Sequence, residues 1–203
     1  IFNASSDELI QKAALRPQIA RNIVQKQAFS DAEKEIAYCQ RHGIQIIAST
    51  DPQYPPLLHE IPDYPPVLYV KGEVNVLSTR CISMVGTRQA TPYGQTMCNR
   101  LVDQLAERIP ELCIVSGLAF GIDVAAHRAA LAAHVPTIAV LANALPGVTP
   151  AQHAGVARDI LAHGGALVSE LHSQSKQNGN FYLTRNRIIA ALSAGCIVVE
   201  SPD

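Results

Sequence analysis

The chain has 203 residues, of which 48% are apolar and 16% are charged. This composition can fill the core of one generous domain, and it excludes a disordered chain, a coiled coil and a highly charged tail protein. The 16 basic and 17 acidic residues give a net charge of -1, which excludes a uniformly basic nucleic-acid coat but leaves a local basic patch open.

The five cysteines form no CxxC pair, and Cys81, Cys113 and Cys196 lie in apolar runs typical of buried strands. This placement predicts reduced core thiols in a cytoplasmic protein. The N-terminus has no signal-peptide pattern, and every apolar run is shorter than the roughly 18 residues that span a bilayer. We therefore expect no membrane partner.

Residues 1–43 are predicted to be helical. Ser5 and Ser30 each precede a glutamate by three positions, which is the spacing of a capping box, and Gly43 is a good helix stop. This is too little chain for an independent core, so the segment is predicted to be the end of a small helical domain. Because the first residue is Ile1 rather than methionine, we expect an N-terminal piece to be missing.

Residues 44–79 form a proline-rich, extended connection in this interpretation. Short strands are predicted at 44–47 and 67–70. Prolines just before the second strand favour an edge or connecting position for it.

From residue 80 to residue 203 the pattern is regular. Apolar runs at 81–85, 112–116, 137–141, 166–169 and 196–200 alternate with helical patterns near 92–108, 121–133, 151–163 and 183–194. Such alternation predicts an α/β fold, with a mainly parallel sheet covered by helices on both faces. Only three residues follow the last run, so we expect this domain to be incomplete at its C-terminus.

Ligands of open α/β sheets bind at the carboxyl ends of the strands. The first such turn contains Gly86, Thr87 and Arg88, followed by Thr91-Pro92, a good helix start. An arginine beside exposed amides suits a phosphate or another anion. The alternative is a plain turn with a surface arginine.

The second turn runs from Ser116 through Gly117, Ala119 and Gly121. It matches neither the GxGxxG dinucleotide fingerprint nor a P-loop, so we expect no cofactor. Asp123 and His127 follow it, four positions apart on one helix face, and they are predicted to pair and brace the turn. Spacing supplies no further metal ligands, so no metal site is expected.

The third turn contains Phe181, Arg185, Asn186 and Arg187, after a polar loop that carries Lys176. Because the two arginines diverge by about 200° on a helix, we expect one to bind a phosphate and the other to pair inward, with Glu200 or Asp123. Cations beside aromatic rings are the combination that holds single strands. The alternative is a solvated loop above core aromatics.

Two carboxylates lie at strand ends: Glu170 follows the fourth run and Glu200 ends the fifth. They suit a general acid and base, or else they pair with Arg185 or Arg187.

The segments VGTRQATPYG (85–94), SGLAFGIDVAAHRAAL (116–131), TIAVLANAL (137–145) and FYLTRNRIIAALS (181–193) closely resemble the DNA-processing protein A family, DprA or Smf. The resemblance implies a Rossmann-like domain that binds single-stranded DNA cooperatively, loads the RecA recombinase onto it during natural transformation, and catalyses no reaction. It also implies that the N-terminal helices are the remnant of a sterile-alpha-motif-like (SAM-like) domain, and that the full-length protein is a homodimer.

The resemblance and the turn chemistry together predict a DNA groove. Its expected contact residues are Gly86, Thr87, Arg88, Ser116, Gly117, Ala119, Gly121, Lys176, Phe181, Arg185, Asn186 and Arg187. Four further residues are expected to support it: Asp123, His127, Glu170 and Glu200.

Some positions depart from the family pattern. The loop 142–153 lacks the usual glycine-rich segment, and Tyr182 and Leu183 replace the usual Phe-Pro. Two other functions stay open: a phosphoribohydrolase of the lysine-decarboxylase-like group using Glu170 and Glu200, and a nucleotide-sensing or protein-interaction module.

Overall fold

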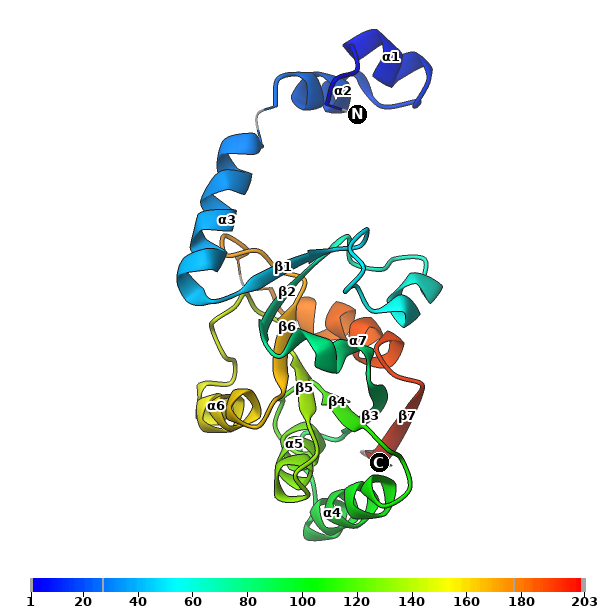
Figure 1. The fold of residues 1–203 in the computed structure, drawn as a ribbon, viewed down its shortest axis with the longest axis vertical. Coiled ribbons are helices and arrows are strands. Elements are labelled where there is room, and N and C mark those ends of the chain that lie inside the picture. Colours follow the sequence, from blue (N-terminus) through cyan, green and yellow to red (C-terminus); the bar gives the residue numbers. More distant parts are fainter. Residues whose placement is uncertain (1, 27, 177, 202–203) are drawn as a thin grey trace. The chain divides into compact units, whose positions relative to one another are not determined.

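The structure, a computed structural model, describes residues 2–26, 28–176 and 178–201 (Figure 1). Contacts between residues divide the chain into two compact units, Ile1–Arg41 and His42–Asp203.

The first unit is helical, as predicted. Its helices are α1 (Ser6–Gln11), α2 (Pro17–Val24) and α3 (Phe29–His42), the last of which ends one residue into the second unit. The capping box at Ser5 is confirmed, because the Ser5 hydroxyl accepts from the Glu8 amide and the Glu8 carboxylate accepts from the Ser5 amide. The one predicted at Ser30 is wrong, since α3 already begins at Phe29. Gly43 ends α3 with a φ of 62°, as expected of a stop.

The second unit is built on one seven-stranded sheet. Its strands are β1 (Gln45–Ala48), β2 (Val67–Gly72), β3 (Arg80–Gly86), β4 (Leu112–Ser116), β5 (Thr137–Val140), β6 (Ala166–Ser169) and β7 (Gly195–Glu200). Their spatial order is β1-β2-β6-β5-β4-β3-β7. The pairs from β6 to β7 are parallel, and β1 and β2 add two antiparallel strands beside β6. The predicted α/β fold with a mainly parallel, Rossmann-like sheet is confirmed.

The proline-rich segment contributes strands β1 and β2 to this sheet. Of the two positions predicted for the second of these strands, an edge or a connecting one, the edge is wrong, because β2 pairs with β1 on one side and with β6 on the other. Pro65 and Pro66 precede β2 and therefore remove no hydrogen-bond donor from either ladder. That residues 1–43 belong to a SAM-like domain stays a prediction.

Helices cover both faces of the sheet (Figure 1). One face carries α4 (Pro92–Ala106), α5 (Ile122–Ala132) and α6 (Ala154–Ala162), which follows the short η3 (Ala151–His153). The other carries α7 (Phe181–Ala191) with the 3-10 helices η1 (Pro56–Glu60) and η2 (Val74–Ser78). Met84, Ile114 and Ile122 are fully buried in the first layer, and Leu58 and Ile188 in the second.

The chain reverses its direction across the sheet at β3. From β3 the connections through α4, α5 and α6 step outward to β6, whereas α7 returns the chain to β7 on the other side of β3. This is the topological switch point at which open α/β sheets leave a crevice for ligands. The described part of the chain has no helix long and apolar enough to cross a membrane.

The edge position of β7 corrects one prediction about the cysteines. Cys81 and Cys113 are buried as predicted, but Cys196 is exposed. β7 is an outer strand of the sheet, and alternate residues of it face the layer of α7. Because α7 does not cover this strand, Val198 is 64% exposed as well.

Candidate functional site

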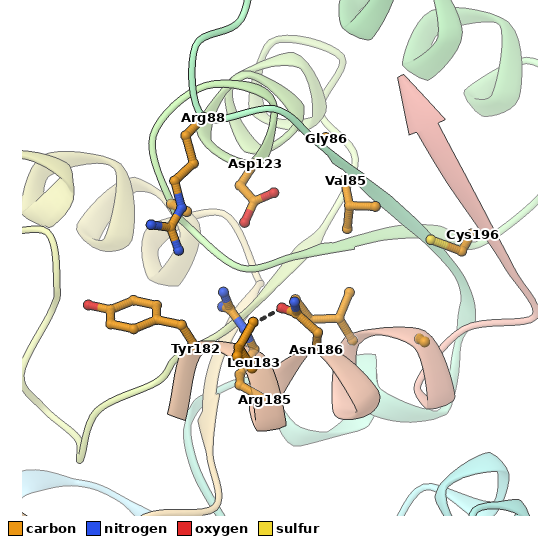
Figure 2. Close-up of a pocket in the computed structure, with 12 residues that line it drawn as sticks. Val85, Gly86, Arg88, Asp123, Tyr182, Leu183, Arg185, Asn186 and Cys196 are labelled. Atoms are coloured by element: carbon orange, nitrogen blue, oxygen red, sulfur yellow. Dashed lines mark hydrogen bonds between the residues drawn. The ribbon is translucent and has the colours of Figure 1, made fainter. Parts of the chain in front are cut away.

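A hollow of about 300 Å³ opens at the switch point, between the carboxyl ends of β3 and β4 and the start of α7 (Figure 2). Six of the predicted residues line it: Gly86, Arg88, Ala119, Asp123, Arg185 and Asn186. The sequence thus brings the first three turns to one place, as expected for strand ends at a common edge.

Arg88 is the exposed cation of this hollow. Its guanidinium carbon lies 5.5 Å from the centre of the Tyr182 ring, a distance at which cation and ring attract. Its turn is fixed from two sides, because the Thr87 amide donates to the Glu200 carbonyl over 2.8 Å and the Thr87 carbonyl accepts from the Ile122 amide over 3.0 Å. Arg88 therefore projects from a turn held between β7 and α5.

The backbone amides at the start of α4, where an anion was expected to bind, donate hydrogen bonds within the protein instead. Thr91 caps the helix by accepting from the Gly94 amide over 3.1 Å, as predicted, and Pro92 is its first residue. The Thr91 amide, however, donates to the Glu200 carboxylate over 2.9 Å. Glu200 thus accepts from the helix start rather than pairing with an arginine, and the exposed guanidinium of Arg88 is a group of this turn that can hold an anion.

Asp123 lies in the hollow and is only 7% exposed. Burial raises the pKa of its carboxyl, while the nearby Arg185 guanidinium and the Ala119 and Gly117 amides act in the opposite direction. The carboxylate therefore ties the second turn to the start of α5. Ser116, also buried, donates from its hydroxyl to the Met84 carbonyl over 2.6 Å and so joins β4 to β3.

The predicted pairing of Asp123 with His127 is wrong. The His127 Nδ1 lies 2.8 Å from the Thr137 hydroxyl. This hydroxyl donates its only proton to the Ile114 carbonyl over 2.7 Å. Nδ1 must therefore be the donor. Complete burial lowers the pKa of His127 to about 3, because a charged ring would lose its hydration. His127 braces α5 against β5 instead.

This buried histidine predicts a pH-dependent stability. Because the folded-state pKa is depressed from 6.5 to about 3, the unfolded chain binds the proton first, and stability is lost as pH falls below the unfolded value. We expect a loss of about 1.4 kcal/mol per pH unit between roughly pH 6 and pH 4. His127→Gln keeps a donor for Thr137 but cannot titrate, so urea unfolding of this variant should show a flatter profile. Parallel profiles for the two proteins would contradict the assignment.

Arg185 is buried rather than presented to solvent, with 4% of its surface exposed. Its Nη1 donates to the Gly117 carbonyl over 2.7 Å and to the Val140 carbonyl, and its Nε donates to Asn186 (Figure 2). Gly117 leaves the room for it, because a Cβ there would collide with the guanidinium. In this arrangement Arg185 positions the second turn against α7.

Arg187 also pairs within the protein. Its Nη2 donates to Glu170 over 2.6 Å and its Nε lies 3.0 Å from Asp63. The two arginines meet different partners, as their divergence on the helix predicts, but both pair within the protein, whereas one was expected to be left for a phosphate. Neither Glu200 nor Asp123 is an ion-pair partner of either arginine within 4.0 Å among the described residues. Glu170 was the predicted alternative and is confirmed as the partner of Arg187.

The remaining predicted residues lie outside the lining of the hollow. Lys176 is exposed in the loop before α7, and Phe181 is half-buried at the first position of that helix. The structure instead presents Tyr182 and the 74% exposed Leu183 there. Because Tyr182 replaces the phenylalanine of the family pattern, this aromatic residue can be chosen from the sequence.

The two carboxylates considered for catalysis are far apart. Glu170 follows β6 and Glu200 ends β7, with β5, β4 and β3 between them. Four steps of strand spacing separate them by about 19 Å. A general acid and base must both reach one bond, so the proposed catalytic pair is wrong.

The altered loop 142–153 packs beneath the second turn. The buried Asn143 donates from its side-chain amide to the Gly147 carbonyl over 2.8 Å and closes the loop on itself. The His153 Nδ1, 2.8 Å from the Leu118 carbonyl, holds the loop to the turn. The Phe120 and His153 rings make an edge-to-face contact, with their centres 4.8 Å apart.

Comparison with known proteins gives one consistent family. The family model described as DNA recombination-mediator protein A matches residues 45–203. Protein Smf of Escherichia coli is 38% identical over 169 residues, which are 83% of this chain and 45% of that protein. DNA processing protein DprA of Bacillus subtilis is 35% identical over 204 residues, which are 100% of this chain and 66% of that protein.

Solved structures agree with these relatives. The chain resembles DNA processing protein A of Streptococcus pneumoniae with a TM-score of 0.75 and 30% identity, over 90% of this chain and 62% of that one. It also resembles the protein of that name from Helicobacter pylori, described for its single-stranded DNA binding mode, with a TM-score of 0.68 and 28% identity, over 78% of this chain and 69% of that one. The chain thus spans 45–66% of the two relatives above.

Proposed function

Because this chain belongs to the DNA recombination-mediator protein A family, we propose that it binds single-stranded DNA across the carboxyl edge of its sheet. The observation that supports this best is Arg88, an exposed cation beside the Tyr182 ring at the mouth of the switch-point hollow. A guanidinium holds a phosphate, and a flat ring next to it offers a stacking surface for an unpaired base. The bases of a duplex are already stacked and cannot use that ring.

The charge distribution suits a small number of phosphate contacts. The net charge of the chain is -1, so attraction must come from local cations. Arg185 and Arg187 are engaged within the protein, which leaves Arg88 as the arginine of the predicted set that is exposed. Each neutralised phosphate of a single strand contributes about -0.7 to the slope of log K against log salt. We expect a shallow slope and an affinity that depends on several chains binding side by side.

Replacing Arg88 tests the proposal. Fluorescence anisotropy with a labelled single strand of about 20 nucleotides should show saturable binding that is weaker for the duplex of equal length. Arg88→Ala should weaken binding about tenfold, since a charge-assisted phosphate contact is lost, and should make the salt slope shallower by about 0.7. Arg88→Lys keeps the charge but not the planar contact with Tyr182, so its loss should be smaller.

Arg108→Ala is the matched control. Arg108 is an exposed arginine just after the end of α4, and therefore at the opposite edge of the sheet from the hollow. If the Arg88 and Arg108 variants bound the strand equally well, Arg88 would not be at the interface. Preference for the duplex would contradict the choice of substrate.

The family resemblance supports a wider role, which is part of this proposal. The protein would act in the cytoplasm, without catalysis of its own, and at full length it would form a homodimer that loads RecA onto incoming strands. Faster RecA-dependent ATP hydrolysis on a strand coated beforehand with single-strand-binding protein is the measurement for the loading step.

A further inference from the structure

A second hollow lies on the other side of Arg88, and no part of the proposed interface accounts for it. It has a volume of about 410 Å³ and lies between the first turns of α4 and α5, below the Phe120–Gly121 turn. Arg88 lines both this hollow and the one at the switch point. A strand that crosses Arg88 in one direction from the switch point therefore enters the second hollow.

The spacing of the side chains directs several polar groups into this space. Gln95 and Asn99 are four positions apart on α4, and Val124 and Arg128 are four apart on α5, so each pair shares one helix face. All four line the hollow. Gln95, Asn99 and Arg128 are exposed and their polar ends remain accessible.

The chemistry of the lining selects the ligand. The described residues around this hollow include two arginines, three side-chain amides, the Phe120 ring and the His153 imidazole, but no aspartate or glutamate. Cations without a nearby carboxylate attract an anion. Amides that both donate and accept match the hydrogen-bonding edge of a base, and a ring matches its face. Together these groups fit a nucleotide better than a free inorganic anion.

We propose that the hollow between α4 and α5 is a second nucleotide subsite of the same single strand. Phe120 stacks on the base, Gln95 and Asn99 contact its edge, and Arg128 holds the adjoining phosphate. The subsite rests on the proposed function, because it requires a strand that passes over Arg88.

The aromatic side chain of this subsite, Phe120, is exposed but restrained by its neighbours. The Phe120 ring is 48% exposed, yet it packs in an edge-to-face contact with His153, which the Leu118 carbonyl fixes in place. A ring that is half exposed but already restrained by a neighbour loses little freedom when a base stacks on it.

Two substitutions of Phe120 separate stacking from packing. Phe120→Leu keeps an apolar side chain without a ring face, whereas Phe120→Tyr keeps the face. With the labelled strand of about 20 nucleotides, Phe120→Leu should weaken binding about tenfold and Phe120→Tyr should restore it. Equal midpoints of thermal unfolding for the variants would show that the fold is intact.

Arg128→Ala gives an independent readout. It should make the salt slope shallower by about 0.7, as Arg88→Ala does, whereas Arg108→Ala should leave the slope unchanged. If Arg88→Ala weakened binding while Phe120→Leu and Arg128→Ala bound like the unchanged chain, the second subsite would be overturned and the proposed function would stand. If the unchanged chain bound no single strand, both would be overturned.

Discussion

Replacement of Arg185 by alanine is expected to lower the free energy of unfolding by about 4 kcal/mol, although the residue lies in a turn chosen for DNA contact. The loss leaves the Gly117 and Val140 carbonyls without their donor, each at about 1–3 kcal/mol, and opens a cavity beneath α7. It also removes the cation that offsets the burial of Asp123. Urea unfolding measures the change directly.

The pH dependence of this deficit has a definite sign. Burial already raises the pKa of Asp123, and Arg185 works against that rise, so its removal should raise this pKa further. A carboxyl whose folded-state pKa exceeds its unfolded value contributes stability that is present at low pH and lost as pH rises through the folded pKa. The deficit of Arg185→Ala should therefore be larger at roughly pH 8 than at pH 5.

Asn186→Ala serves as the control, because Asn186 also lines the hollow but is exposed, and the variant removes one 3.3 Å hydrogen bond from the Arg185 Nε while the guanidinium stays in place. It should change stability by less than about 1 kcal/mol. The opposite pattern, in which Arg185→Ala folds as stably as the unchanged chain but no longer binds a single strand, would show that Arg185 contacts DNA directly, as the sequence suggested.

The parallel part of the sheet could be predicted from sequence because its signals are local. Each of the runs at 81–85, 112–116 and 166–169 is apolar apart from one serine and ends near glycine or a polar turn, so its type and its limits follow from neighbouring residues. The pairing of β2 with β6 could not be predicted in this way. Their paired residues Tyr69 and Ser169 are far apart along the chain, and the prolines near β2 indicate only where the strand begins.

In the turns of the site, too, local features could be predicted from sequence and distant partners could not. Thr91-Pro92 predicted the start of α4 because capping depends on the next few residues. The choice of polar partners depends on distant residues: Glu200 meets the amide of Thr91, and His127 meets Thr137. The burial of an arginine also depends on distant residues, because its guanidinium needs space. The Arg185 guanidinium occupies space that a side chain at Gly117 would fill.

Gly121 is the position at which the two turns of the site depend on each other most directly. Its φ of 78° lies in a region that residues with a side chain rarely adopt. A Cβ there would overlap the Thr87 carbonyl oxygen and lie 2.6 Å from the Arg88 carbonyl carbon. Both neighbours are backbone atoms, so relief requires the whole turn that presents Arg88 to move.

Gly121→Ala is therefore expected to lower the free energy of unfolding by about 3 kcal/mol, from overpacking and from the left-handed backbone together. Gly155→Ala is the matched control, since Gly155 lies in α6 and a Cβ there meets no atom within 4 Å. Alanine favours a helix over glycine, so the control should be neutral or more stable by up to about 1 kcal/mol. Urea unfolding of the two variants tests the difference. Equal stability would mean that the first turn moves freely away from α5, and that Arg88 is not held in place by this contact.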